Sequence, residues 1–273
     1  MEIIRIQGGQ KLSGKVGIRG AKNSALPLMV SSLLTEDQLT LDNLPQLADI
    51  STMEAILINH GVQVEWQRNG LDSSNLVRLN AENITNTTAD HDLVRKMRAS
   101  ILVLGPLLAR KGNARVSLPG GCAIGTRPVD IHLSGLSQLG AEITLVDGYV
   151  EANAPNRLRG SVLSLPFPSV GATENLIMAA TLATGTTVIK NAACEPEVED
   201  LARCLVKMGA NIQGIGTNKL EIEGEISLNG TKHSVIPDRI EAGTYAIAAA
   251  ITYGEVELQG VIPKHLETTL TIL

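Results

Sequence analysis

The chain has 273 residues, of which 44% are hydrophobic and 19% charged, and its formal net charge is -5. This length and apolar content can bury one large core or two smaller ones, as in an ordinary globular protein. The negative charge and an aromatic content of 2% argue against a nucleic-acid-binding surface, because such surfaces use basic and stacking side chains.

The beginning of the sequence does not resemble a targeting or membrane segment. Glu2 and Arg5 stand where a signal peptide would carry its apolar stretch. Apolar runs also stay well short of the roughly 20 residues that a transmembrane helix needs. We therefore expect a cytoplasmic protein that acts on small molecules, without nucleic acid or membrane as a partner.

In chain order, three segments rich in small apolar residues predict helices, each followed by a short strand. They are residues 24–34 with 39–41, residues 94–109 with 114–118, and residues 173–183 with 186–189. A helix as apolar as residues 176–183 belongs inside a bundle rather than at a surface. We therefore expect buried helices with sheets outside them.

A second kind of helix follows each of these strands and ends at a glycine before another strand. The three copies cover residues 50–64, 129–143 and 198–212, with the glycines Gly61, Gly140 and Gly209. A leucine lies four residues before each glycine, at Leu57, Leu136 and Leu205. The glycine supplies the left-handed cap that lets the chain reverse, so the sequence predicts a repeated helix-strand unit.

A fourth unit begins with a helix at residues 242–251 and a strand at residues 256–258, and its second helix starts near His265. No glycine follows that helix before Leu273. We interpret this as the truncation of a longer parent protein. The alternative is a natural C-terminal helix.

The segment 117–132 leaves a strand, crosses a glycine-rich loop and enters a helix. Gly120 and Gly121 give the loop conformational freedom, and Pro128 suits the first turn of the helix. Cys122 lies between them, five residues before Arg127, whose charge would lower the pKa of a nearby thiol. Cys122 is therefore a candidate proton donor and acceptor, or alternatively an inert loop cysteine. With Cys194 and Cys204 the cysteines number three and show no CxxC spacing, which argues against a disulfide framework or a zinc site, so we expect no metal.

Residues 119–130, Pro-Gly-Gly-Cys-Ala-Ile-Gly-Thr-Arg-Pro-Val-Asp, resemble a signature of the UDP-N-acetylglucosamine enolpyruvyl transferases. Residues 20–27, 97–100, 169–173 and 237–241 are similar to further family blocks in the same order. The resemblance implies an α/β (α+β) fold, an inside-out α/β prism of repeated helix-sheet units around buried helices. It also implies a catalytic and UDP-sugar domain at residues 22–235 and an incomplete second domain made of residues 1–21 and 236–273.

The resemblance further implies an activity. Family members add the 3-hydroxyl of UDP-N-acetylglucosamine to C2 of phosphoenolpyruvate, protonate C3 and eliminate phosphate, the first committed step of peptidoglycan synthesis. No cofactor is required. Cys122 would be the acid that protonates C3 and the target of the epoxide antibiotic fosfomycin.

Binding residues carry over by the same resemblance. Lys22, Asn23 and Arg127 would bind phosphoenolpyruvate. The expected contacts of the nucleotide sugar are Arg98, Arg127, Pro128, Val129, Asp130, Ile131, Phe167, Pro168, Ser169 and Val170. Several alternatives remain: Lys22 as a solvated surface charge, Asn23 as a helix cap, Arg98 paired with Asp90 or Asp92, and Ser169 as a helix-start residue.

The family's aspartate general base and a further arginine are expected beyond Leu273. We therefore predict that this polypeptide alone has little or no turnover, because general bases typically contribute about 10² to 10⁴ in rate. Two other functions are possible: a 3-phosphoshikimate 1-carboxyvinyltransferase, which shares the architecture but lacks the cysteine loop, and a catalytically silent UDP-sugar-binding fragment.

Overall fold

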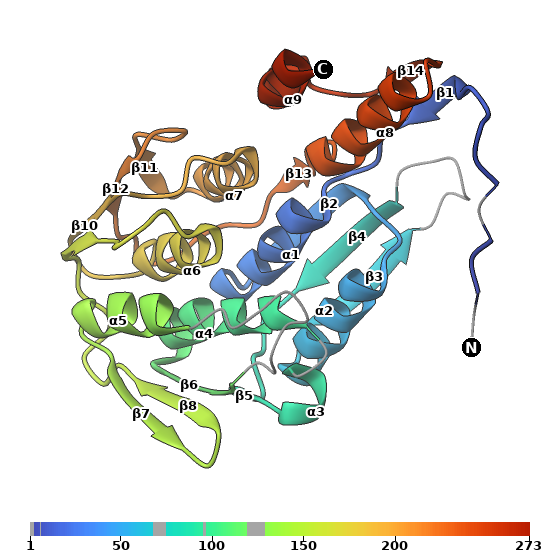
Figure 1. Ribbon diagram of the computed structural model, residues 1–273. Coiled ribbons are helices and arrows are strands. Elements are labelled where there is room, and N and C mark those ends of the chain that lie inside the picture. The colour runs from blue at the N-terminus through green and yellow to red at the C-terminus, as the bar shows by residue number, and fades with distance from the viewer. Residues whose placement is uncertain (1–2, 6, 68–74, 95–96, 119–128) are drawn as a thin grey trace. The chain divides into compact units, whose positions relative to one another are not determined.

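A computed structural model describes residues 3–5, 7–67, 75–94, 97–118 and 129–273 (Figure 1). The chain divides into two compact units. The larger unit is Lys22–Ile236, and the smaller unit combines Met1–Ala21 with Pro237–Leu273.

The described part of the larger unit contains three four-stranded sheets. The first, in the order β13-β2-β4-β3, consists of Lys232–Ser234, Gln38–Leu44, Asn75–Asn80 and Gln63–Gln67. The second, β5-β6-β8-β7, consists of Thr88–Ala89, Asn113–Ser117, Tyr149–Asn153 and Glu142–Val146. The third, β11-β12-β10-β9, consists of Asn211–Gln213, Lys219–Glu223, Thr186–Lys190 and Val162–Ser164.

The three sheets share one topology. In each, three strands pair antiparallel, and one short edge strand pairs parallel: β13 with β2, β5 with β6, and β9 with β10. That edge strand comes from the repeat that precedes it in the chain, and β13 at the end of the third repeat returns to the sheet of the first. The three repeats therefore exchange edge strands in a closed cycle, and the fourth strand of each sheet comes from another repeat.

Apolar helices fill the core of this unit. α1 (Lys22–Ser31) with the 3-10 turn η1 (Ser32–Leu34), η2 (Arg98–Val103) with α4 (Leu104–Lys111), and α6 (Val170–Ala180) are almost entirely buried. Their side chains belong to one continuous hydrophobic cluster with the inner faces of the three sheets. The expectation of buried helices covered by sheets is confirmed (Figure 1).

The glycine-capped helices are α2 (Ala48–Asn59), α5 (Asp130–Gln138) and α7 (Pro196–Lys207). Gly61, Gly140 and Gly209 have φ angles of 99°, 94° and 105°. In each copy the N–H after the glycine donates to the carbonyl of the predicted leucine, at 3.0, 3.1 and 2.9 Å. This is the Schellman cap, and it confirms the repeat that the sequence predicts.

The second buried helix differs from the expectation of one helix over residues 94–109. A short helix α3 (His91–Val94) comes first, and a 3-10 turn, η2, leads into α4. Pro106 has no N–H to continue the helical ladder, and the N–H of Gly105 donates to Oδ1 of Asn175 at 2.9 Å. A side chain from another repeat thus interrupts the regular helix.

The smaller unit contains a two-stranded sheet and short helices. β1 (Ser13–Gly17) pairs parallel with β14 (Glu255–Gln259), and α8 (Arg239–Ile251), η3 (Pro263–Leu266) and α9 (Glu267–Ile272) complete it. Its core is small and centres on Ile18, Ala242 and Leu266. Unlike α1 and α6, α8 leaves apolar side chains exposed, among them Ile240, Ile247 and Ile251.

Within the described ranges, the helices are too short or too polar to cross a bilayer. The same residues hold no group of three or more histidine, cysteine or acidic side chains arranged to bind a metal ion.

Candidate functional site

The glycine-rich loop lies outside the described residues, and with it Cys122, Arg127 and Pro128. The structure describes what flanks it: β6, which ends at Ser117, and α5, which begins at Asp130 after Val129 at the N-cap position. The described residues on either side of the loop therefore define the candidate site.

Lys22 and Asn23 occupy the first turn of α1. The ammonium Nζ of Lys22 lies 3.0 Å from Oδ2 of Asp49, which is in the first turn of α2. The two side chains are 39% and 36% exposed, so Lys22 is paired yet still accessible to a ligand. Asn23 is exposed as the second residue of the helix, which is not the N-cap position. Asp49 was not predicted as a site residue, because the predicted helix begins at residue 50, whereas α2 begins at Ala48.

The beginnings of α5 and α6 lie side by side. A Cβ atom added to Gly171 would be 3.5 Å from Cε1 of His132, so the first turns of the two helices are in contact. Ser169 is the N-cap of α6, and its hydroxyl accepts from the N–H of Ala172 at 3.5 Å. Helix N-termini present unpaired N–H groups and a positive dipole end, an arrangement that favours phosphate groups.

His132 lies beneath these two helix starts and is 4% exposed. Burial, and then the positive charge of Arg98, lower its pKa to about 4, while Asp130 acts in the opposite direction. Its ring is therefore neutral at neutral pH. The effect of Arg98 shows that its positive charge acts on the ring of His132 in α5, and its contact with a nucleotide sugar stays a prediction. The sequence analysis predicts no role for His132.

Asn175 of α6 holds this region together. Its amide Nδ2 lies 3.1 Å from Nδ1 of His132 and 3.3 Å from the carbonyl of Ile101, while its Oδ1 accepts from Gly105. One fully buried amide thus ties α5, η2 and α4 to α6. Because α1 packs against both η2 and α6, these contacts also support the helix that carries Lys22.

The other predicted nucleotide contacts fall into two groups. Asp130 is exposed, Val129, Ser169 and Val170 are partly buried, and Ile131 is 5% exposed, so Ile131 can offer a ligand little beyond its backbone. Phe167 and Pro168 are exposed in the turn before α6, with Phe167 54% exposed.

A buried acid also lies on α6. Glu174 is 3% exposed, and its Oε1 has no hydrogen-bond partner among the described residues. Burial raises its pKa well above the usual value, and Glu197 and Glu195 add to the effect. This environment therefore favours the neutral form of Glu174 in the folded chain.

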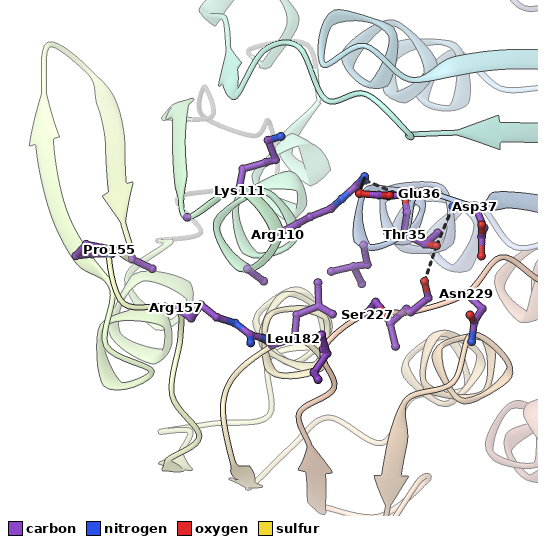
Figure 2. A pocket seen from close by; sticks show the side chains of 16 residues that line it. Thr35, Glu36, Asp37, Arg110, Lys111, Pro155, Arg157, Leu182, Ser227 and Asn229 are labelled. Atoms are coloured by element: carbon purple, nitrogen blue, oxygen red, sulfur yellow. Dashed lines mark hydrogen bonds and ion pairs between the residues drawn. The ribbon is translucent and has the colours of Figure 1, made fainter.

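A pocket of about 610 Å³ lies at the opposite, C-terminal ends of the buried helices (Figure 2). Arg110 donates to the carbonyls of Leu33, Thr35 and Ala81, and Arg157 donates to those of Leu182 and Glu225. The carbonyls of Leu33, Thr35 and Leu182 lie where buried helices end, and those of Ala81 and Glu225 lie just after the strands β4 and β12. Because none of the predicted site residues lines this pocket, it is not the candidate site.

A sequence model described as EPSP synthase (3-phosphoshikimate 1-carboxyvinyltransferase) matches residues 6–273. The chain is 60% identical over 266 residues to a UDP-N-acetylglucosamine 1-carboxyvinyltransferase of Granulibacter bethesdensis, covering 97% of this chain and 62% of the relative. It is 56% identical over 278 residues to the protein of the same name in Rhodospirillum centenum, covering 100% of this chain and 64% of the relative. The chain thus spans less than two thirds of the length of these curated relatives.

The structure is similar to the crystal structure of the enolpyruvyl transferase NikO from Streptomyces tendae, with a TM-score of 0.76 and 25% identity. The match covers 88% of this chain and 56% of that chain. This likeness confirms the predicted fold, an α/β prism with buried helices.

Proposed function

This chain belongs to the EPSP synthase family, and on that premise we propose that it contributes the sugar-nucleotide side of an enolpyruvyl transferase of peptidoglycan synthesis. The reaction would move the enolpyruvyl group of phosphoenolpyruvate to the 3-hydroxyl of UDP-N-acetylglucosamine and release phosphate. The observation that carries the proposal is that relatives at 53–60% identity bear the name of this transferase. We further propose that it acts in the cytoplasm on these two small molecules.

The chemistry requires an acid that later acts as a base. The sugar 3-hydroxyl oxygen forms a bond to C2 of phosphoenolpyruvate and loses its proton to a base, while C3 takes a proton from the Cys122 thiol. In the second step the bond from C2 to the phosphate oxygen breaks, and C3 returns a proton to the thiolate, which restores the double bond. A thiol suits both steps because its ordinary pKa of about 8.5 lies near neutrality. We assign the first base to no residue of this chain.

The proposal needs binding groups for two anions. Lys22, which is partly exposed beside Asp49, would neutralise the phosphate of phosphoenolpyruvate with Asn23 next to it. Arg127, outside the described residues, would be the guanidinium partner. The adjoining starts of α5 and α6, with Arg98 nearby, suit the diphosphate and uridine of the nucleotide sugar. Backbone N–H groups of residues 129–131 and 169–170 would make many of these contacts. The side chain of Ile131 is buried, so Ile131 could contribute little except its backbone.

The shikimate-pathway alternative has weaker support. The family model bears the name of the shikimate-pathway enzyme, but the relatives at 53–60% identity are named UDP-N-acetylglucosamine 1-carboxyvinyltransferase. A silent sugar-nucleotide-binding function differs from the proposal only in turnover. Binding and chemistry therefore have to be measured separately.

Calorimetry and intact-mass measurements on the 273-residue chain test the proposal. We expect UDP-N-acetylglucosamine to bind, shikimate 3-phosphate to leave the melting temperature unchanged, and fosfomycin to add one adduct. Cys194 is the matched control for the adduct. Cys194 is exposed, but partial burial of its thiol and the charge of Glu195 raise the pKa of that thiol. A smaller fraction of it is therefore thiolate than in an ordinary cysteine.

The adduct should therefore disappear in Cys122→Ser and persist in Cys194→Ser. An adduct that follows Cys194, or stabilisation by shikimate 3-phosphate without binding of the nucleotide sugar, would contradict the proposal. Phosphate release at a normal enzymatic rate from this chain would overturn only the expectation that it has little turnover by itself.

A further inference from the structure

The carboxylate of Asp200, on α7, is buried and accepts three hydrogen bonds. Oδ1 accepts from Nε2 of His233 at 2.8 Å. Oδ2 accepts from the hydroxyl of Ser24 and from the backbone N–H of Ile236, the latter at 3.3 Å. Asp200 is 4% exposed and His233 is 5% exposed, so this carboxylate depends on protein donors rather than on water.

Two of these donors are far apart in the sequence and close to the ends of the larger unit. Ser24 is the third residue of α1, in the same helical turn as Lys22 and Asn23. Ile236 is the last residue of the unit that begins at Lys22. A single carboxylate oxygen therefore holds the first turn of α1 to the segment that follows β13.

His233 and Lys207 fix the orientation of the carboxylate. Nζ of Lys207 lies 3.2 Å from Nδ1 of His233. Because a lysine ammonium only donates, Nδ1 is the acceptor, and Nε2 carries the proton that is donated to Asp200. The fully buried thiol of Cys204 lies one turn further along α7. Burial, together with the charge of Asp200, raises the pKa of this thiol to about 12.

The ion pair of Lys22 with Asp49 cannot hold the first turn of α1 in a fixed position. That ion pair is more than one third exposed, and exposed ion pairs between flexible side chains hold their geometry weakly. The first turn of a helix is also the part that opens most easily. The buried bond from Ser24 to Asp200 is thus the rigid element beneath Lys22 and Asn23.

We propose that Asp200 is a positioning residue for the phosphoenolpyruvate site, acting through Ser24 on the backbone that carries Lys22 and Asn23. This inference rests on the proposed function. Asp200 touches no reacting atom in it. Its carboxylate fixes where the Lys22 ammonium and the Asn23 amide meet the phosphate, and the nucleotide-sugar groups on α5 and α6 do not depend on it.

Ser24→Ala tests the proposal with Ser31→Ala as the matched control. Both serines are fully buried in α1, and each variant removes one hydroxyl. Ser31, however, donates to the carbonyl of Leu28 within its own helix and is hydrogen-bonded to the thiol of Cys204, not to Asp200. The difference between the two variants therefore reports the bond to Asp200 rather than the loss of a buried hydroxyl.

The readouts are the dissociation constants of phosphoenolpyruvate, measured with saturating UDP-N-acetylglucosamine, and of UDP-N-acetylglucosamine alone. Amide hydrogen exchange of residues 22–26 and 236 is the third readout. For Ser24→Ala we expect roughly tenfold weaker phosphoenolpyruvate binding, the size of one hydrogen bond to a charged group, and an unchanged affinity for the nucleotide sugar. Exchange should accelerate in both segments, whereas Ser31→Ala should change neither affinity nor the exchange of residue 236.

Asp200→Asn provides a second line of test, because its effect on phosphoenolpyruvate binding should not add to that of Ser24→Ala in the double variant. Equal behaviour of Ser24→Ala and Ser31→Ala, or equal weakening of both ligands, would overturn the positioning role. If the wild-type chain binds neither ligand, the proposed function fails, and hydrogen exchange alone decides whether Ser24 is held by Asp200. Exchange that Ser24→Ala leaves unchanged would refute that too.

Discussion

The imidazole Nδ1 of His132 lies 3.1 Å from the amide Nδ2 of Asn175, in the core between α5 and α6. The Asn175 amide also lies 3.3 Å from the carbonyl of Ile101, so its nitrogen is a donor in this network. Nδ1 of His132 must then accept, and the ring proton resides on Nε2. The start of α5, where the resemblance puts nucleotide-sugar contacts, therefore rests on a neutral histidine.

The neutral state of His132 predicts a pH dependence of stability. Its pKa in the folded chain, about 4, lies below the ordinary value of 6.5, so the unfolded chain binds more protons between these values. The stability from neutral His132 is complete above pH 6.5 and is lost as the pH falls, by about 3 kcal/mol at pH 4. Urea unfolding of wild type and His132→Gln at neutral and acidic pH should show a smaller acid loss in the variant. An imidazole that titrates near 6.5 by NMR would contradict this.

The close packing of α4 on α6 predicts a strong effect of Gly105→Ala. An added Cβ would lie 2.7 Å from the backbone oxygen of Asn175, which cannot move without shifting α6. We expect a loss of about 2–3 kcal/mol in the free energy of unfolding, as for an overpacked core. Gly140→Ala is the control: its φ is +94° but nothing lies within 4 Å, so only backbone strain of about 1 kcal/mol is expected. Equal losses in denaturant titrations would refute the packing argument.

Much of this fold was predictable because its signals are local. The glycine after each of α2, α5 and α7 fixes a left-handed cap, and the apolar composition of α1 and α6 requires burial. What could not be predicted depends on distant partners. The interruption before α4 needs Asn175, seventy positions along the chain, and the parallel edge strands β5, β9 and β13 have only two or three residues each.

The candidate site was also only partly predictable from local sequence signals. Lys22, Asn23 and Ser169 were found through their motifs, and the structure places them at helix starts. Asp49 and Asp200 were missed because single carboxylates have no sequence signature, and each meets its partner only after folding. Cys122 remains a prediction, since it lies outside the described residues.

Glu174 predicts the opposite pH dependence from that of His132. Its pKa is raised by burial and by Glu197 and Glu195, so the stability from its neutral form is present below about pH 4.5 and is lost as the pH rises. Glu174→Gln removes this titration without changing the shape of the side chain. The melting temperature of the variant minus that of wild type should therefore increase as the pH rises above about 4.5. A difference that stays constant with pH would show that Glu174 is not a neutral buried acid.

Lys22 should matter for ligand binding far more than for folding. Its ion pair with Asp49 is partly exposed, so Lys22→Ala should change the free energy of unfolding by less than about 1 kcal/mol. The same change removes the ammonium proposed to neutralise phosphate, and the affinity for phosphoenolpyruvate should fall at least tenfold. Lys15→Ala is the control, because it breaks an exposed ion pair with Glu257, 2.8 Å long, in the smaller unit, which contains none of the predicted binding residues. If both variants bind phosphoenolpyruvate as wild type does, Lys22 is a solvated surface charge, and the proposed phosphate contact at the start of α1 is wrong.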